Sequence, residues 1–113
     1  MNPEIKARWI ATLRNTKYKQ GIGHLCINNH YCCLGVLLEV AKDDLAIVIE
    51  DLGDGNKTYD GRVSFPEKST MLSLFGDFNS PIVNINGTNT SLVTHNDDGR
   101  TFLEIADAIE SQL

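Results

Sequence analysis

The last thirteen residues, 101–113, restrict the fold more than any other part of the sequence. Thr101 and Glu104 have the spacing of a capping box, in which each side chain accepts a hydrogen bond from the other residue's free backbone N–H group. Behind this cap, apolar residues recur on one helical face and acidic residues face solvent. The apolar stripe consists of Phe102, Ile105, Ala106, Ile109 and Leu113. A helix with one apolar face needs other elements to cover it, so the pattern predicts a packed domain.

The rest of the chain alternates between helix signals and hairpin signals. Asn2 followed by Pro3 begins a helix, and Asn86-Gly87 is the strongest hairpin turn in the sequence. We therefore predict an α+β fold, with about four helices packed on a mainly antiparallel sheet of hairpins, as a single domain over residues 1–113. The expected helices span 3–14, 33–41, 66–74 and 101–113. The expected strand pairs are 23–27 with 30–33, 47–49 with 59–65, and 82–85 with 91–94.

Composition places the chain among globular proteins of a reducing compartment. It has 42% hydrophobic and 22% charged residues, no apolar run of the length that a membrane span requires, and no signal pattern. Its three cysteines, Cys26, Cys32 and Cys33, are most simply free thiols. We therefore expect a cytoplasmic protein without a membrane partner and without a cofactor.

The charge is polarised along the chain. The net charge is −5, but residues 1–25 carry five basic residues and one acidic residue, a net +4, which leaves −9 for residues 26–113. A net acidic chain argues against direct binding of a nucleic-acid polymer. An anionic small molecule would favour the N-terminal segment, whereas the acidic remainder favours a basic partner.

Two polar segments are the candidate binding surface. Residues 17–23 place two lysines beside flexible glycines, and residues 95–100 precede a helix start, whose N–H groups suit an anion. The alternative for both segments is a solvated polar turn. A pocket requires that the two segments meet in the fold. The candidate ligand-binding residues are Lys17, Tyr18, Lys19, Gln20, Gly21, Asn96, Asp97, Arg100 and Thr101.

Cysteine and histidine cluster between residues 24 and 33. The predicted hairpin would project His24, Cys26 and Cys33 from one face, which is the weaker, metal-binding alternative. Core packing is favoured, because buried cysteine usually behaves as a small hydrophobe. An enzyme that uses Cys33 as nucleophile, with His24 or His95 as base, is a third alternative, but the apolar setting of Cys33 opposes a reactive thiolate.

Three stretches in this order resemble a family of small, mostly uncharacterised proteins of bacteriophages and prophages. They are Lys17-Tyr18-Lys19-Gln20-Gly21-x-Gly23-x-Leu25, Cys32-Cys33-Leu34-Gly35-Val36-Leu37, and Asn96-Asp97-x-Gly99-x-Thr101-Phe102-x-Glu104-Ile105-Ala106-Asp107-x-Ile109-Glu110. The resemblance implies expression in the cytoplasm of a bacterial host. It also makes host takeover or counter-defence a natural role.

Two non-enzymatic functions follow as hypotheses. In the first, the chain binds and sequesters a small anionic, nucleotide-type ligand, with a pocket that lies between subunits if the chain is a homo-oligomer. In the second, it inhibits a host defence or nucleic-acid protein through its acidic surface, including Glu104, Asp107 and Glu110. Both are more consistent with the sequence than an enzyme.

Overall fold

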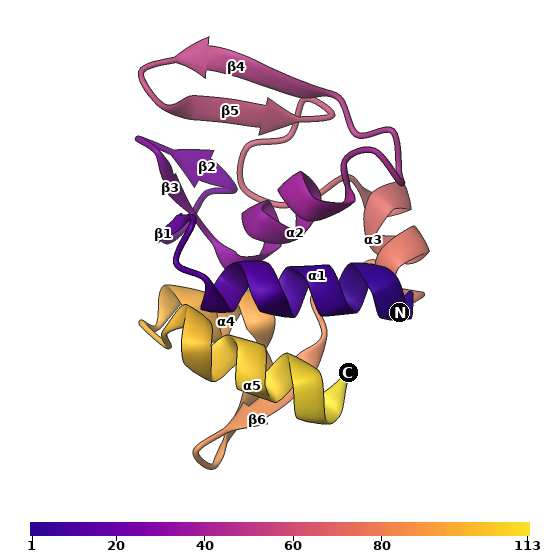
Figure 1. The fold of residues 1–113 in the computed structure, drawn as a ribbon, viewed down its shortest axis with the longest axis vertical. Coiled ribbons are helices and arrows are strands. Elements are labelled where there is room, and N and C mark those ends of the chain that lie inside the picture. Colours follow the sequence, from indigo (N-terminus) through magenta and orange to yellow (C-terminus); the bar gives the residue numbers. More distant parts are fainter.

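A computed structural model describes residues 1–113, and its first helix begins where the sequence predicts. The side chain of Asn2 accepts hydrogen bonds from the backbone N–H groups of Glu4 and Ile5, at 2.8 and 3.1 Å. Helix α1 (Pro3–Arg14) follows, and its buried face consists of Ile5, Trp9, Ile10 and Leu13. It lies across the middle of the molecule, between α2 and α5 (Figure 1).

The first hairpin also turns at the predicted position. Strands β2 (Cys26–Ile27) and β3 (His30–Tyr31) are antiparallel, and both turn residues have positive φ, 53° at Asn28 and 62° at Asn29. A two-residue strand, β1 (Lys19–Gln20), pairs parallel to β3, so the order of this sheet is β1-β3-β2. The sequence did not predict this parallel strand.

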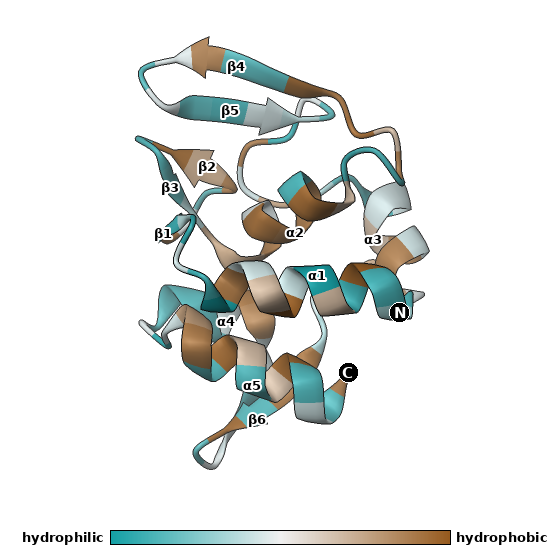
Figure 2. Ribbon diagram, in the orientation of Figure 1, coloured by the Kyte–Doolittle hydropathy of each residue, from teal (hydrophilic) through white to brown (hydrophobic).

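Helix α2 (Cys33–Ala41) is the apolar centre of the fold, as predicted. Only Glu39 and Val40 among its nine residues are partly exposed, and Figure 2 shows it almost entirely hydrophobic. Gly35 allows the helix to approach the preceding chain, because a Cβ atom at this position would collide with the carbonyl oxygen of Leu25.

The second hairpin forms, but with different strands from those predicted. Strands β4 (Ile49–Gly53) and β5 (Asn56–Tyr59) directly flank the tight turn at Asp54-Gly55. The prediction of 59–65 as the returning strand was wrong, since two-residue turns place the partner strand immediately after the turn. The chain turns again after Tyr59, whose N–H and C=O groups pair with Arg62.

Helix α3 (Lys68–Phe75) starts after Glu67, two residues later than predicted, and ends at Gly76.

The third hairpin is followed by a helix that the sequence did not predict. Strands β6 (Ile82–Ile85) and β7 (Thr88–Ser91) turn at Asn86-Gly87. The prediction that 91–94 is a strand was wrong, because the Ser91 side chain caps a short helix, α4 (Leu92–Asp97).

The last helix, α5 (Phe102–Gln112), has the predicted capping box and packs its apolar stripe against α1 and α4. Together the helices enclose one cluster of 26 buried hydrophobic residues. The three hairpins remain three separate small sheets around this core, so the α+β class is confirmed, with five helices. None of these helices combines the length and the apolar character that crossing a membrane requires.

Candidate functional site

The two polar segments selected from the sequence meet in the fold, although more than 70 residues separate them. The Gln20 side-chain amide donates hydrogen bonds to Asn96 Oδ1 at 3.0 Å and to the Arg100 carbonyl oxygen at 2.6 Å. Gln20 Oε1 in turn accepts a hydrogen bond from the Phe102 N–H group at 3.1 Å. The β1 segment is therefore joined to the loop before α5.

Asn96 extends this network into the core. It is completely buried, its Nδ2 donates to the Gly21 carbonyl oxygen at 2.8 Å, and its Oδ1 accepts from the Cys33 N–H group at 3.1 Å. Asp97 Oδ1 accepts from the Gly23 N–H group at 3.0 Å. We call the side chains of Gln20, Asn96 and Asp97, with these partners, the latch. It holds β1, the start of α2 and the end of α4 together.

The latch leaves few polar groups for a ligand. At the start of α5, the N–H groups of Thr101 and Glu104 bond within the capping box, and the Phe102 N–H group is bonded to Gln20. An anion at this helix start would have to displace them. None of the three surface hollows is lined by any of the nine residues predicted to bind a ligand.

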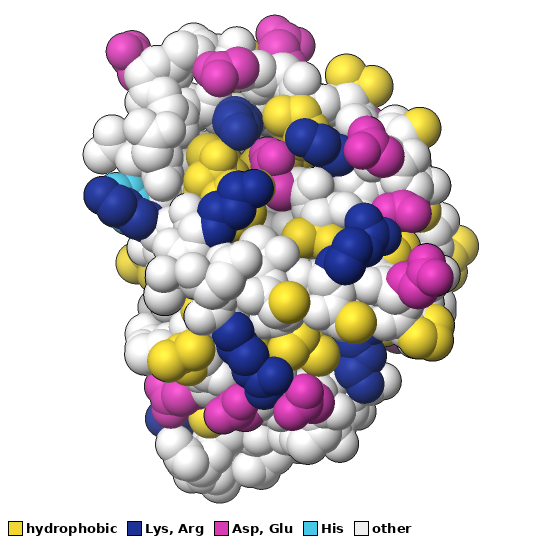
Figure 3. All heavy atoms as spheres, viewed as in Figure 1, with side chains coloured by type: hydrophobic (Ala, Val, Ile, Leu, Met, Phe, Trp, Pro, Cys, Tyr) yellow, Lys and Arg dark blue, Asp and Glu magenta, His cyan; other side chains and the backbone are white.

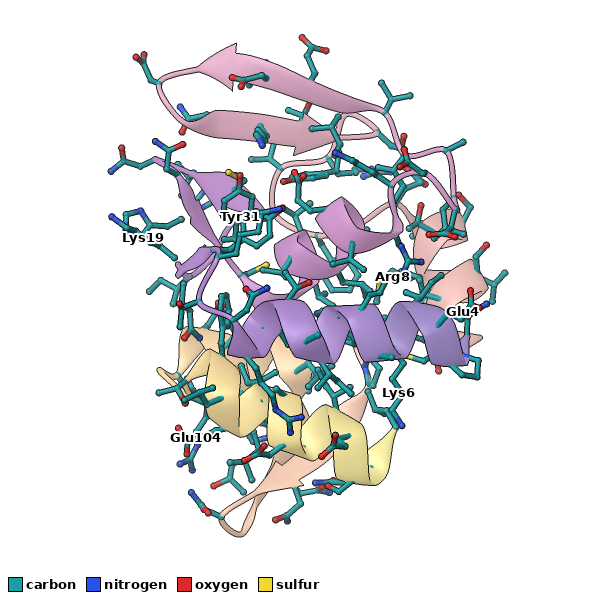
Figure 4. All side chains as sticks on the ribbon, viewed as in Figure 1. Glu4, Lys6, Arg8, Lys19, Tyr31 and Glu104 are labelled. Atoms are coloured by element: carbon teal, nitrogen blue, oxygen red, sulfur yellow. The ribbon has the colours of Figure 1, made fainter.

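Cations remain free beside the latch. Lys17 and Lys19 are exposed and have no acidic partner. Lys17 Nζ lies 5.3 Å from the Tyr18 ring centroid, and the Tyr18 and Tyr31 rings meet edge-on at 4.6 Å. Lys19 points outward, away from the cations of α1 (Figure 4). Lys17 is therefore exposed and Tyr18 partly exposed, whereas Tyr31 is buried.

The cysteines and histidines do not form a ligand set or a nucleophile with its base. The Cys26 thiol donates to the Gly55 carbonyl oxygen, whereas the Cys33 thiol points to Leu92, and no group of three metal-binding side chains is present. Burial raises the pKa of Cys33 well above its ordinary value, which opposes the thiolate form. His95 is buried and its Nε2 lies 2.8 Å from the Val83 carbonyl oxygen.

A polar cluster that the sequence did not indicate joins α2 to the second hairpin. Glu39 Oε2 accepts a hydrogen bond from the Tyr59 hydroxyl at 2.7 Å and lies 3.5 Å from Lys57 Nζ. Lys57 also donates to the Tyr31 hydroxyl at 3.0 Å. Burial, together with the hydrogen bond to Glu39, raises the pKa of Tyr59. The Glu39 side chain is only 7% exposed, so this cluster anchors the hairpin to the core.

The surface of the β4–β5 hairpin is acidic and uncompensated. Glu50, Asp51, Asp54 and Asp60 are exposed, and none has a basic partner. Two apolar side chains are exposed beside them, Val48 at 68% and Leu52 at 57%. Figure 3 shows acidic side chains at the outer rim of this end of the molecule, with lysines and arginines spread over the middle of this face.

The acidic face of α5 differs from the hairpin, because its charges are paired. Arg14 contacts Asp107 at 2.7 Å and Glu110 at 3.1 Å, and Glu104 is held by the capping box and lies 3.6 Å from Arg100. The sequence-based hypothesis named these three carboxylates as part of the acidic surface. The structure gathers four unpaired carboxylates on the hairpin instead, whereas other unpaired carboxylates, such as Asp43 and Asp98, lie elsewhere on the surface.

Comparison with known proteins identifies a family but no function. A model of a domain of unknown function, DUF8296, matches residues 1–113, so the chain belongs to this family. No curated protein and no solved structure matches the chain.

Proposed function

We propose that this member of the DUF8296 family is a non-enzymatic binding protein that attaches to a basic surface of another protein through its β4–β5 hairpin. The observation that carries the proposal is the set of four exposed hairpin carboxylates without a basic partner. Uncompensated charge on a protruding element steers and orients association with an oppositely charged partner.

The exposed apolar side chains favour a protein over other basic or polar partners. Val48 and Leu52 lie within the same short segment as Glu50 and Asp51. Apolar groups bordered by charge are typical of protein–protein interfaces. Nucleic acids and anionic membranes would both be repelled by the carboxylates.

The resemblance to bacteriophage and prophage proteins supports a bacterial host protein as the target. Host nucleases and other nucleic-acid-binding proteins present basic surfaces to phosphate backbones. An acidic hairpin that occupies such a surface would compete with the nucleic acid. We therefore propose inhibition of a host defence or nucleic-acid protein as the role in the cell.

The test is a charge reversal on the hairpin with a matched control. Glu50→Lys/Asp54→Lys changes the hairpin charge, and Asp43→Lys/Asp98→Lys makes the same change in net charge at exposed sites elsewhere. After capture of a partner from a bacterial lysate, affinity is measured with the purified pair. We expect the hairpin variant to weaken binding about tenfold or more, and the control about twofold or less. Equal weakening of binding by both variants would refute attachment through the hairpin.

Sequestration of a small anionic ligand remains a second candidate, supported by the free cations and the partly exposed Tyr18 beside the latch. A panel of cyclic dinucleotides and ADP-ribose derivatives should then raise the melting temperature. Lys17→Ala/Lys19→Ala should abolish the rise, whereas Lys42→Ala/Lys68→Ala, at two other exposed and unpaired lysines, should preserve it. No rise with any ligand of the panel would contradict this candidate.

A further inference from the structure

We propose that the partner attaches as an extended, basic strand paired with the outer edge of β4. This inference rests on the proposed function and specifies its geometry. The outer edge of β4 is unpaired and has exposed apolar side chains, and the charge around it identifies the occupant.

The hydrogen bonds of the hairpin show which backbone groups of β4 point outward. Val48 faces β5, because its carbonyl oxygen accepts from the Asp60 N–H group at 2.8 Å and its N–H group donates to Asp60 Oδ1 at 2.9 Å. Tyr59, the residue opposite Ile49, directs its own N–H and C=O groups to Arg62 and not to β4. Since the direction alternates along a strand, the N–H and C=O groups of Ile49 and Asp51 point away from β5.

Only β4 offers such an edge on this hairpin. The other strand, β5, lies against β2, and the turn that precedes it contacts the first hairpin, where the Asn29 N–H group donates to the Gly55 carbonyl oxygen at 2.9 Å. β4 is the outermost element at its end of the molecule, with no other segment along its free side (Figure 1). A bulge between Asp51 and Gly53 ends the regular edge, so the paired stretch is short.

The carboxylates determine what can pair with this edge. Acidic side chains and bulges normally protect an edge strand from indiscriminate pairing. A second copy of β4 would place Glu50 and Asp51 opposite like charges, which is unfavourable. A strand with lysine or arginine opposite Glu50 or Asp51 would instead compensate the charge on that face of the hairpin. The occupant is therefore an extended basic segment of a partner protein, and its binding depends on salt.

The experiment uses three decapeptides of alternating lysine and threonine, titrated into the full chain. The first is unmodified, the second is N-methylated at every lysine, and the third is N-methylated at every residue. The second retains one edge with free N–H groups, whereas the third has none, and all three carry the same charge. The readout is hydrogen exchange of individual backbone amides in the full chain.

Strand pairing predicts that the first two peptides slow exchange at Ile49 and Asp51 about tenfold, that exchange at Glu50 changes little, and that the third peptide has no effect. Equal binding of all three peptides, or no slowing at Ile49 and Asp51 with any of them, would overturn the strand model. The Glu50→Lys/Asp54→Lys variant tests the proposed function separately. If it binds the first peptide as well as the wild type does, charge docking at the hairpin fails.

Discussion

The latch and the β4–β5 hairpin are both rich in polar residues, but they use them in opposite ways. In the latch, the side chains of Gln20 and Asn96 bond only to other parts of the chain. In the hairpin, exposed carboxylates have no basic partner, and β4 pairs with no strand other than β5. Polar residues that satisfy one another stabilise a fold, and polar residues with unused capacity are the ones available to a partner. The proposed interface therefore lies outside the two polar segments, residues 17–23 and 95–100, that the sequence indicates as a binding surface.

The largest effect expected is loss of the latch. Asn96→Ala removes the acceptor of the Cys33 N–H group and the donor to Gly21. Because buried groups left without partners cost about 1–3 kcal/mol each, we expect the free energy of unfolding to fall by about 3–5 kcal/mol. Urea denaturation measures this change. Asn89→Ala, at an exposed asparagine of β7, should alter stability by about 0.5 kcal/mol or less.

Alkaline pH should destabilise the folded state through the buried thiol of Cys32. Burial raises the pKa of Cys32 to about 11, whereas the unfolded thiol titrates near its ordinary value of about 8.5. The folded state therefore binds the proton more tightly, and stability that is complete below about pH 8.5 is lost as pH rises through about 11. Cys32 alone should contribute a loss of about 3 kcal/mol, seen in denaturation curves between pH 8 and 11. A Cys32→Ser variant with the same pH dependence would contradict this origin.

An intermediate effect is expected where the hairpin is anchored. Glu39→Gln removes the charge that faces Lys57 and weakens the acceptor of the Tyr59 hydroxyl. Because Lys57 is partly exposed, we expect the free energy of unfolding to fall by about 2 kcal/mol, which is less than the cost of breaking a fully buried ion pair. Amide exchange should accelerate in β4 and β5 more than in α1. Uniform acceleration over the whole chain would show that the hairpin does not open separately.

The smallest effect on stability is expected for the hairpin carboxylates themselves. Glu50→Gln/Asp54→Asn removes two charges that contact no cation, so the free energy of unfolding should change by about 0.5 kcal/mol or less. The same variant should still weaken binding of a basic partner. Stability and binding are measured on one preparation by thermal denaturation and titration. A large loss of stability would show that these carboxylates support the fold, as the latch does, and would contradict their role in an interface.

Much of the fold could be read from local signals in the sequence. The caps at Asn2 and Thr101, the apolar run of α2 and the turns at residues 28–29 and 86–87 all act within a few residues, and the structure confirms each of them. The two wrong predictions, strands at 59–65 and at 91–94, also have local causes. β5 consists largely of polar residues and lacks the β-branched pattern of a strand, and Ser91 was not recognised as a cap.

The candidate site was only partly predictable. The sequence selected segments that do lie together, but their mutual hydrogen bonds depend on contacts across 70–80 residues, which no local pattern contains. The ion pairs of Arg14 with α5 likewise became visible only in three dimensions. Ligand binding at the latch stays a prediction. The hairpin was missed because its carboxylates form no motif, and they differ from other unpaired carboxylates, such as Asp77 and Asp98, only in lying together beside exposed apolar side chains.

The latch also has a consequence for how the chain is made. Gln20 and Gly21 leave the ribosome well before their partners Asn96, Arg100 and Phe102, which lie more than 70 residues further along the chain. Helix α1 packs extensively on α5, so its apolar face also lacks a cover until then. During translation the growing chain therefore exposes a hydrophobic surface, which makes it a target for chaperones and proteases. The final helix closes the fold and ends that vulnerable period.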